Sequence, residues 1–176
     1  MSINEELQES AEHARDDFSR GAGATMAIIA ALLAVVAVSG HITTTEELLM
    51  QLKASDNWAF YQAKSSRRYQ SEVARDLMNT MPGEKASQIA GKYAANVERY
   101  EKEAEAIQEQ AREFGKESDM AGKKALRLHF GEVFLELAIV FSSLAILARK
   151  RLFWAIGVGG ATLGVVVSAT VFLLQR

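Results

Sequence analysis

One short stretch of the chain brings together residues that could handle protons or cations. His129, Glu132 and Glu136 are spaced three and four residues apart, so one face of a helix presents all three. An imidazole and carboxylates can relay protons, and with groups from neighbouring copies they can ligate a divalent ion, whose identity the sequence leaves open. The alternative is that they lie at the depth of lipid headgroups and pair with Lys124 or Arg127.

No established catalytic pattern accompanies this group. The sequence has no glycine-rich phosphate loop, no HExxH zinc motif and no G-x-S-x-G nucleophile motif. It has no cysteine, which excludes disulfides, thiolate metal sites and cysteine nucleophiles. The net charge of -2 gives no overall basic field for binding nucleic acid. We therefore expect a protein that is not an enzyme, uses no cofactor and does not bind nucleic acid.

The elements that must position these residues follow from the distribution of charge. The 42 charged side chains, 20 basic and 22 acidic, all lie outside three apolar runs, residues 21–40, 137–148 and 152–175. A helix needs about 20 apolar residues to cross the hydrocarbon core of a bilayer. The first and third runs have that length, and the second gains it by extending back to Leu128.

We therefore predict an all-α membrane protein with three transmembrane helices. Their predicted ranges are 21–40, 128–148 and 152–176, with a basic turn at 149–151. A signal peptide is a poorer interpretation of the first run, because residues 1–20 form an acidic tail and signal peptides begin with positive charge. Core helices of a soluble bundle remain the alternative for all three.

Residues 41–127, between the first two spans, carry 14 basic and 14 acidic side chains and are predicted to be helical. Thr44 and Glu47 fit a capping box, which predicts a helix start there. The only strong break is Thr-Met-Pro-Gly at 80–83, because proline lacks an amide hydrogen and glycine permits a reversal. Two helices of this length would make an extramembrane antiparallel hairpin about 50–60 Å long, with its tip near 80–83.

The second predicted helix of the hairpin carries a seven-residue repeat typical of coiled coils. Apolar residues alternate at spacings of four and three from Ala86 to Phe114 and continue toward Leu128. Gly115 and the cap-like Ser118–Asp119 predict a kink in that continuation. The best candidates for a helix-packing or oligomer interface within the repeat are Tyr93, Val97, Tyr100, Ala104 and Ile107.

Small residues predict a second helix-packing surface. Gly160, Gly164 and Ser168 recur every four residues on the last span, which lets helix backbones approach closely in lipid. This stripe is expected to pack either within one chain or between copies. Because each predicted helix of the hairpin buries only a narrow stripe, a homo-oligomer is expected, and a monomeric hairpin is the alternative.

A cluster of aromatic and polar residues on the first predicted helix of the hairpin is a candidate partner contact. Its members are Trp58, Phe60, Tyr61, Gln62 and Lys64. Aromatic side chains bury large areas at low entropic cost, so they dominate many interfaces. The alternative is that they form the hairpin's own core by interleaving with Tyr93, Tyr100 and Phe114.

The basic turn predicts the orientation of the chain. Basic residues in short loops favour the cytoplasmic side of a membrane, and this turn consists of Arg149, Lys150 and Arg151. The hairpin is therefore predicted to lie on the opposite, external side. Lys123, Lys124 and Arg127 at the other end of the second span oppose this, but charges in long loops weigh less.

Several segments of the chain resemble one family of bacterial membrane proteins, the domain of unknown function 4337. The matching segments are TEELL at 45–49, ASDNWAFYQAKS at 54–65, GEVFLELAIV at 131–140 and the Arg-Lys-Arg turn at 149–151. The resemblance covers most of the chain from residue 10 onward. It implies a bacterial membrane location and an order of one span, a charged helical region and two further spans. We expect this membrane to be the inner membrane. The resemblance implies no activity.

On this basis we expect a homo-oligomeric integral membrane scaffold or assembly protein whose coiled-coil hairpins form an extramembrane rim or cage. The expected partners are the lipid bilayer and further copies of the chain. The alternative is an ion channel or transport-accessory protein, with Glu132 and Glu136 lining a path.

Overall fold

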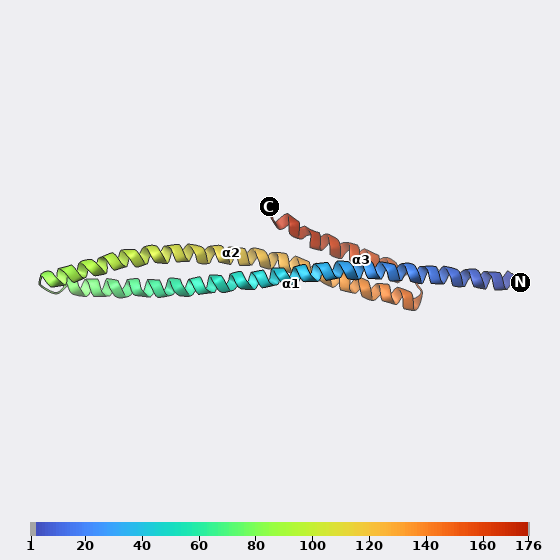
Figure 1. Ribbon diagram of the computed structural model, residues 1–176, viewed down its shortest axis with the longest axis horizontal. Coiled ribbons are helices and arrows are strands. Elements are labelled where there is room, and N and C mark those ends of the chain that lie inside the picture. The colour runs from blue at the N-terminus through green and yellow to red at the C-terminus, as the bar shows by residue number, and fades with distance from the viewer. Residues whose placement is uncertain (1–2, 176) are drawn as a thin grey trace. The chain divides into compact units, whose positions relative to one another are not determined.

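The computed structural model describes the backbone of residues 3–175 and the side-chain burial of residues 17–173. It contains three α-helices, α1 (Ile3–Asn79), α2 (Glu84–Ala148) and α3 (Arg151–Ala169), and a final 3-10 helix, η1 (Thr170–Gln175) (Figure 1). No strand occurs within residues 3–175, which confirms the prediction of an all-α chain. Of the predicted segments, residues 1–2, the side chains of residues 3–16 and Arg176 lie outside the described residues.

The break between α1 and α2 falls where the chain's single proline predicts it. α1 ends at Asn79 and α2 begins at Glu84, so Pro82 and Gly83 lie in the turn. Gly83 has a φ of 116°, a conformation that residues with a Cβ rarely adopt. Thr80 closes the end of α1, because its amide and its hydroxyl both donate to the carbonyl of Leu77.

Both helices continue through the two sites where the sequence predicts an irregularity. The predicted helix start at Thr44 is wrong, since α1 is already helical there and its amides have partners. The hydroxyl of Thr44 instead lies 3.1 Å from the Nε2 atom of His129 on α2. α2 is one continuous helix from Glu84 to Ala148, so Ser118 and Asp119 do not begin a new helix. The Ser118 hydroxyl donates to the carbonyl of Glu47 on α1, at 3.1 Å.

The chain divides into two compact units, and α1 and α2 contribute to both. The first unit contains Met1–Thr45 and Ala121–Arg176, and we call it the apolar unit. The second contains Glu46–Met120, and we call it the charged unit. Each of the three helices includes a stretch long and apolar enough to cross a membrane, as the sequence predicts.

Three helices meet in the core of the apolar unit. Ile29 of α1, Leu135 and Ala138 of α2 and Ala161 of α3 are buried together, with partly buried Leu33, Val36 and Ile139 packed around them. Most of these side chains are aliphatic or small, so the helices approach closely and gain dispersion energy.

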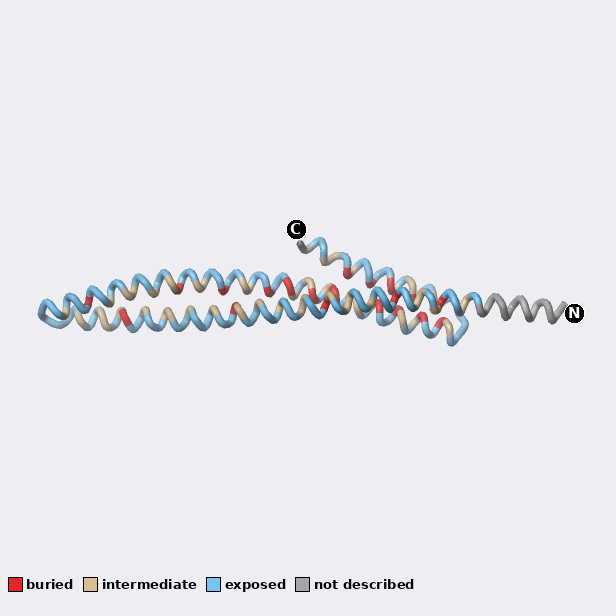
Figure 2. Tube along the Cα trace, viewed as in Figure 1, coloured by how far each residue is buried: buried red, intermediate tan, exposed pale blue. Residues whose placement is uncertain are grey.

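In the charged unit, α1 and α2 lie side by side (Figure 1). Buried residues recur along both helices at intervals (Figure 2), and on α2 they include Ala90, Ala104 and Ala111. Contacts pair Glu47 with Ser118, Lys53 with Phe114 and Lys64 with Glu103. Residue numbers in these pairs rise on α1 as they fall on α2.

Candidate functional site

The structure brings together two of the three residues in the predicted ion or proton site. The Nδ1 atom of His129 lies 3.2 Å from a carboxylate oxygen of Glu132, and its Nε2 atom lies 3.1 Å from the hydroxyl of Thr44 on α1. The imidazole therefore links α1 to α2 as well as contacting the next turn of its own helix. Gly40 of α1 lies beside the ring, since a Cβ there would be 3.4 Å from the imidazole.

Glu136, the third predicted member, is exposed on the surface of α2, whereas Leu135 beside it is fully buried. Within the described residues, no group of three or more His, Cys, Asp or Glu side chains is placed to hold a metal ion. One chain thus supplies an imidazole–carboxylate pair and a separate carboxylate that faces outward.

The predicted small-residue stripe on α3 lies against α2 of the same chain. Gly164 and Ser168 are buried, and Gly160 is partly buried near Ala138. A Cβ added to Gly131 of α2 would lie 1.9 Å from the Ser168 hydroxyl oxygen and 2.8 Å from the Gly164 carbonyl oxygen. The two backbones therefore meet at a distance that only glycine allows at both positions.

The predicted interface residues on α2 of the charged unit are all at least partly buried. Ala104 is 5% exposed, and Tyr93, Val97, Tyr100 and Ile107 are partly buried. The Lys64 ammonium group of α1 lies 5.6 Å from the centre of the Tyr100 ring. This row of α2 therefore faces α1 of the same chain.

The predicted aromatic cluster splits between two faces of α1. Trp58 and Phe60 are exposed, whereas Tyr61 is partly buried and packs edge-on against Trp58, with ring centres 5.6 Å apart. Lys64 points to α2, where it pairs with Glu103, and Gln62 is exposed. Tyr61 shares the side of α1 that faces α2 with Lys53 and Lys64, whose ammonium groups lie over the rings of Phe114 and Tyr100 on α2.

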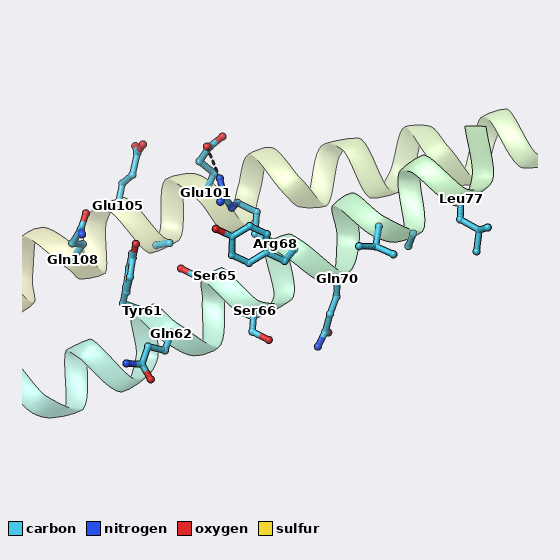
Figure 3. Close-up of a pocket in the computed structure, with 14 residues that line it drawn as sticks. Tyr61, Gln62, Ser65, Ser66, Arg68, Gln70, Leu77, Glu101, Glu105 and Gln108 are labelled. Carbon is cyan, nitrogen blue, oxygen red and sulfur yellow. Dashed lines mark hydrogen bonds and ion pairs between the residues drawn. The ribbon is translucent and has the colours of Figure 1, made fainter. Parts of the chain in front are cut away.

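An open groove of about 1020 Å³ lies in the charged unit next to this cluster (Figure 3). Tyr61, Ser65 and Arg68 line it from α1, and Glu101 and Gln108 line it from α2. Arg68 crosses the groove to Glu101, at 3.0 Å (Figure 3). Gln70 and Leu77, which belong to the same lining, point away from α2 (Figure 3). The groove is polar on the side where the helices meet.

Ion pairs set the electrostatics of the charged unit. The Lys64 ammonium group donates a hydrogen bond to Glu103, which lowers the pKa of the Glu103 carboxyl below its usual range. Within α2, Lys102 donates to Glu98 at 2.7 Å, which lowers the pKa of Glu98 and raises that of Lys102. Lys102 and Glu98 are exposed, and Lys64 and Glu103 are only partly buried, so each pair stabilises the fold only modestly.

Sequence reasoning missed the row of α1 that faces α2. From Met50 to Met78 these residues recur at spacings of four and three, and none of them is exposed. The row includes Lys64, Arg68 and Arg75, whose long side chains cover apolar surface while their charged ends reach carboxylates or water. A heptad count that ignored polarity would have found it, whereas a search for apolar periodicity passes over it.

Comparison with known proteins returns one match. The family model for a domain of unknown function (DUF4337) matches residues 18–174. No curated protein and no solved structure matches the chain.

Proposed function

The chain belongs to the DUF4337 family, a domain of unknown function, and from its own geometry we propose a homo-oligomeric integral membrane scaffold or assembly protein. In this proposal the apolar unit lies in the bilayer, and the charged units of several copies associate in water to form a rim or cage. The lipid bilayer and further copies of the chain are its partners.

The observation that carries the proposal is the exposure of large apolar side chains on the charged unit. Leu52 is 63% exposed, Phe60 62% and Val73 69%, although this unit would lie in water. Several large exposed apolar side chains on a water-facing helix are typical of an interaction site. Narrow helix pairs also gain little from burial within one chain, so association with further copies supplies the missing burial.

A coiled-coil hairpin is the form we propose for the charged unit. Its support is the order of the contacts, because partner residues descend along α2 as they ascend along α1. The rows that face each other have spacings of four and three, the period of knobs-into-holes packing. The turn at Gly83 would be the tip of the hairpin.

We place the protein in the bacterial inner membrane with the charged unit on the periplasmic side. The three apolar stretches support a membrane location. The basic turn Arg149–Arg151 supports the orientation, since short loops rich in arginine and lysine stay in the cytoplasm. Trp154, just beyond this turn, suits the interface between lipid and water.

The experiment that tests the scaffold is the size of the particle extracted in mild detergent. Light scattering that separates the protein mass from bound detergent should report a multiple of 19.3 kDa, and electron microscopy should show more than one charged unit in each particle. A particle with the mass of one chain, in several detergents and in lipid nanodiscs, would refute the scaffold.

Glu136 supports a second candidate function, an ion channel or transport accessory. A carboxylate exposed on the apolar part of a membrane helix is costly unless it faces water, a partner charge or another copy. In an oligomer Glu136, and Glu132 one turn earlier, would line a path between copies. Cation flux into liposomes that contain the protein should then fall with Glu136→Gln, whereas flux equal to that of empty liposomes would exclude this candidate.

A further inference from the structure

The side of α1 that faces away from α2 carries its own heptad row, which we call the outer row. From Thr45 to Leu77 its positions alternate at spacings of four and three, and every one of them is exposed. The row includes Leu49, Leu52, Ala59, Ala63, Val73 and Leu77. Asp56 is its only charged member. At 3.6 residues per turn, the outer row lies about half a turn from the row that contacts α2.

Apolar and charged residues are divided between the two rows of α1 in the opposite way to that expected for an isolated pair of helices. The row that faces α2 contains three cations, Lys64, Arg68 and Arg75, whereas the exposed outer row is mostly apolar or small. Burial of apolar area is the main favourable term in helix association, at about 25 cal/mol per Å². A second partner that covers the outer row therefore accounts for a distribution that α2 alone does not.

The outer row also identifies the partner, because it continues along α1 into the apolar stretch. The same spacing runs back from Thr45 through Ile42, Val38, Val35 and Ile28, and all four are more than half exposed. A partner that follows the whole row must itself be a helix that passes from water into lipid. Copies of one chain share the same membrane orientation, so α1 of a second copy meets this requirement in a parallel arrangement.

The charges beside the outer row are compatible with parallel pairing of two α1 helices. The outer row can be written as heptad positions a and d, with Leu49, Ala63 and Leu77 at a positions. In a parallel pair, the residue just before each a position faces the residue five places later on the partner helix. This rule pairs Gln62 with Arg67 and Tyr69 with Ala74, so no like charges meet at these flanking positions. Asp56 would face its own copy, and a single polar residue of this kind fixes register at a cost in stability.

We propose that α1 of a second copy docks on the outer row, parallel and in register, and that this contact is the primary interface of the oligomer. The inference rests on the proposed scaffold and specifies its surface. The sequence predicts an oligomer interface at the α2 row around Tyr100 or the α3 stripe around Gly164, but both of these contact helices of the same chain. The present proposal places the interface on the exposed face of α1 instead.

Disulfide cross-linking tests the interface directly, because the natural chain has no cysteine. Ala59→Cys, Ala63→Cys and Ser66→Cys each place a thiol on the outer row, where a parallel in-register partner presents the same position. A disulfide needs Cα atoms about 4.4–6.8 Å apart, so only close apposition allows it. Mild oxidation in native membranes should shift each variant from a monomer to a dimer band that reducing agent reverses. Ala106→Cys, on the exposed face of α2, is the matched control and should stay monomeric.

The outcomes separate this inference from the proposed function. Cross-linking on the outer row and none at residue 106 supports the interface. An oligomer by light scattering that does not cross-link at residues 59, 63 or 66 overturns the interface and leaves the scaffold standing. A protein that is monomeric by light scattering and does not cross-link would overturn both the interface and the scaffold.

A second set of substitutions gives a readout that does not depend on cysteine chemistry. Val73→Glu changes an exposed residue, so helix content by circular dichroism should be unchanged while the oligomer dissociates to a smaller particle. Ile89→Glu, at an exposed apolar position on α2, should leave the particle size unchanged. Asp56→Asn removes the facing charges and should make the oligomer more resistant to dilution. Equal behaviour of Val73→Glu and Ile89→Glu would overturn the proposed interface.

Discussion

At the scale of single residues, the contact between α2 and α3 depends on positions without a side chain. Gly131 and Gly164 let the two backbones touch, and Gly157 approaches Ser142, where a Cβ would lie 2.7 Å from the serine hydroxyl oxygen. The Ser142 hydroxyl is buried, and no hydrogen-bond partner is described for it. Close packing of small residues provides the attraction here, because lipid offers little hydrophobic driving force between helices.

Gly131→Ala should separate α2 from α3. The added methyl group meets the Ser168 side chain and the Gly164 backbone, which cannot move aside within a continuous helix. Overpacking of this kind costs about 1–3 kcal/mol, and thermal unfolding in detergent should show the loss. Gly159→Ala is the matched control, because its Cβ meets nothing within 4 Å and should leave stability unchanged or raise it. Equal midpoints for the two variants would contradict the proposed role of the close contact.

The Lys64–Glu103 pair predicts a pH dependence in the charged unit. The pKa of Glu103 is lower in the folded chain than its ordinary value of 4.5, so the carboxylate stabilises the fold above that value. This contribution is lost as the pH falls through the folded-state pKa. Glu103→Gln should therefore be less stable than the natural chain at neutral pH, and the difference should vanish in acid.

Thermal unfolding followed by circular dichroism across this pH range measures the effect. Glu109→Gln, at an exposed position on the same helix, is the control and should lose little stability at neutral pH. A difference between Glu103→Gln and the natural chain that persists unchanged below pH 4.5 would mean that lost packing, rather than the ion pair, is responsible.

At the scale of the elements, the turn between α1 and α2 depends on a glycine with a positive φ. Gly83→Ala should destabilise the charged unit by roughly 1–2 kcal/mol, because a residue with a Cβ is strained at a φ of 116°. Gly91→Ala is the control, since this glycine is helical and its Cβ would meet nothing within 4 Å. Thermal unfolding should move in opposite directions for the two variants. A stabilised Gly83→Ala would show that the turn adopts another conformation.

The continuity of α1 and α2 has a local cause. Neither helix contains a proline, and the glycines within them are isolated or lie in the apolar stretch, where unpaired backbone groups are costly. Hydroxyl side chains also fold back onto the helix, as when Ser39 donates to the carbonyl of Val35 and Thr43 to that of Ser39. Thr44 therefore sits within a helix rather than at its start.

At the scale of the whole molecule, the orientation of the protein in the membrane can be tested directly. Single cysteines at Met81→Cys in the turn and Lys150→Cys in the basic turn report opposite sides of the membrane in our proposal. A membrane-impermeant maleimide should label Met81→Cys in cells with a permeabilised outer membrane, and Lys150→Cys only after the inner membrane is opened. The reverse pattern would invert the orientation and leave the fold unaffected.

The helices themselves were predictable from local signals, and several of the contacts were not. The apolar runs, the break at Pro82 and the α2 repeat are properties of adjacent residues, and each marks an element or a face that the structure contains. The helix start at Thr44 was predicted wrongly, because it was inferred from a short motif whose hydroxyl has its partner on another helix. The split of Trp58 and Tyr61 between two faces also escaped prediction, since a cluster in sequence is not a cluster on a helix.

The amino-acid sequence by itself determines that this chain is helical, that its apolar and charged residues are segregated, and where its helices turn. Those properties depend on backbone hydrogen bonding and on transfer from water, which act on each segment regardless of its neighbours. Only the tertiary structure decides which row of each helix is covered. It places the cationic row of α1 against α2, joins His129 to Thr44 and leaves the apolar outer row free, because these outcomes depend on which faces meet.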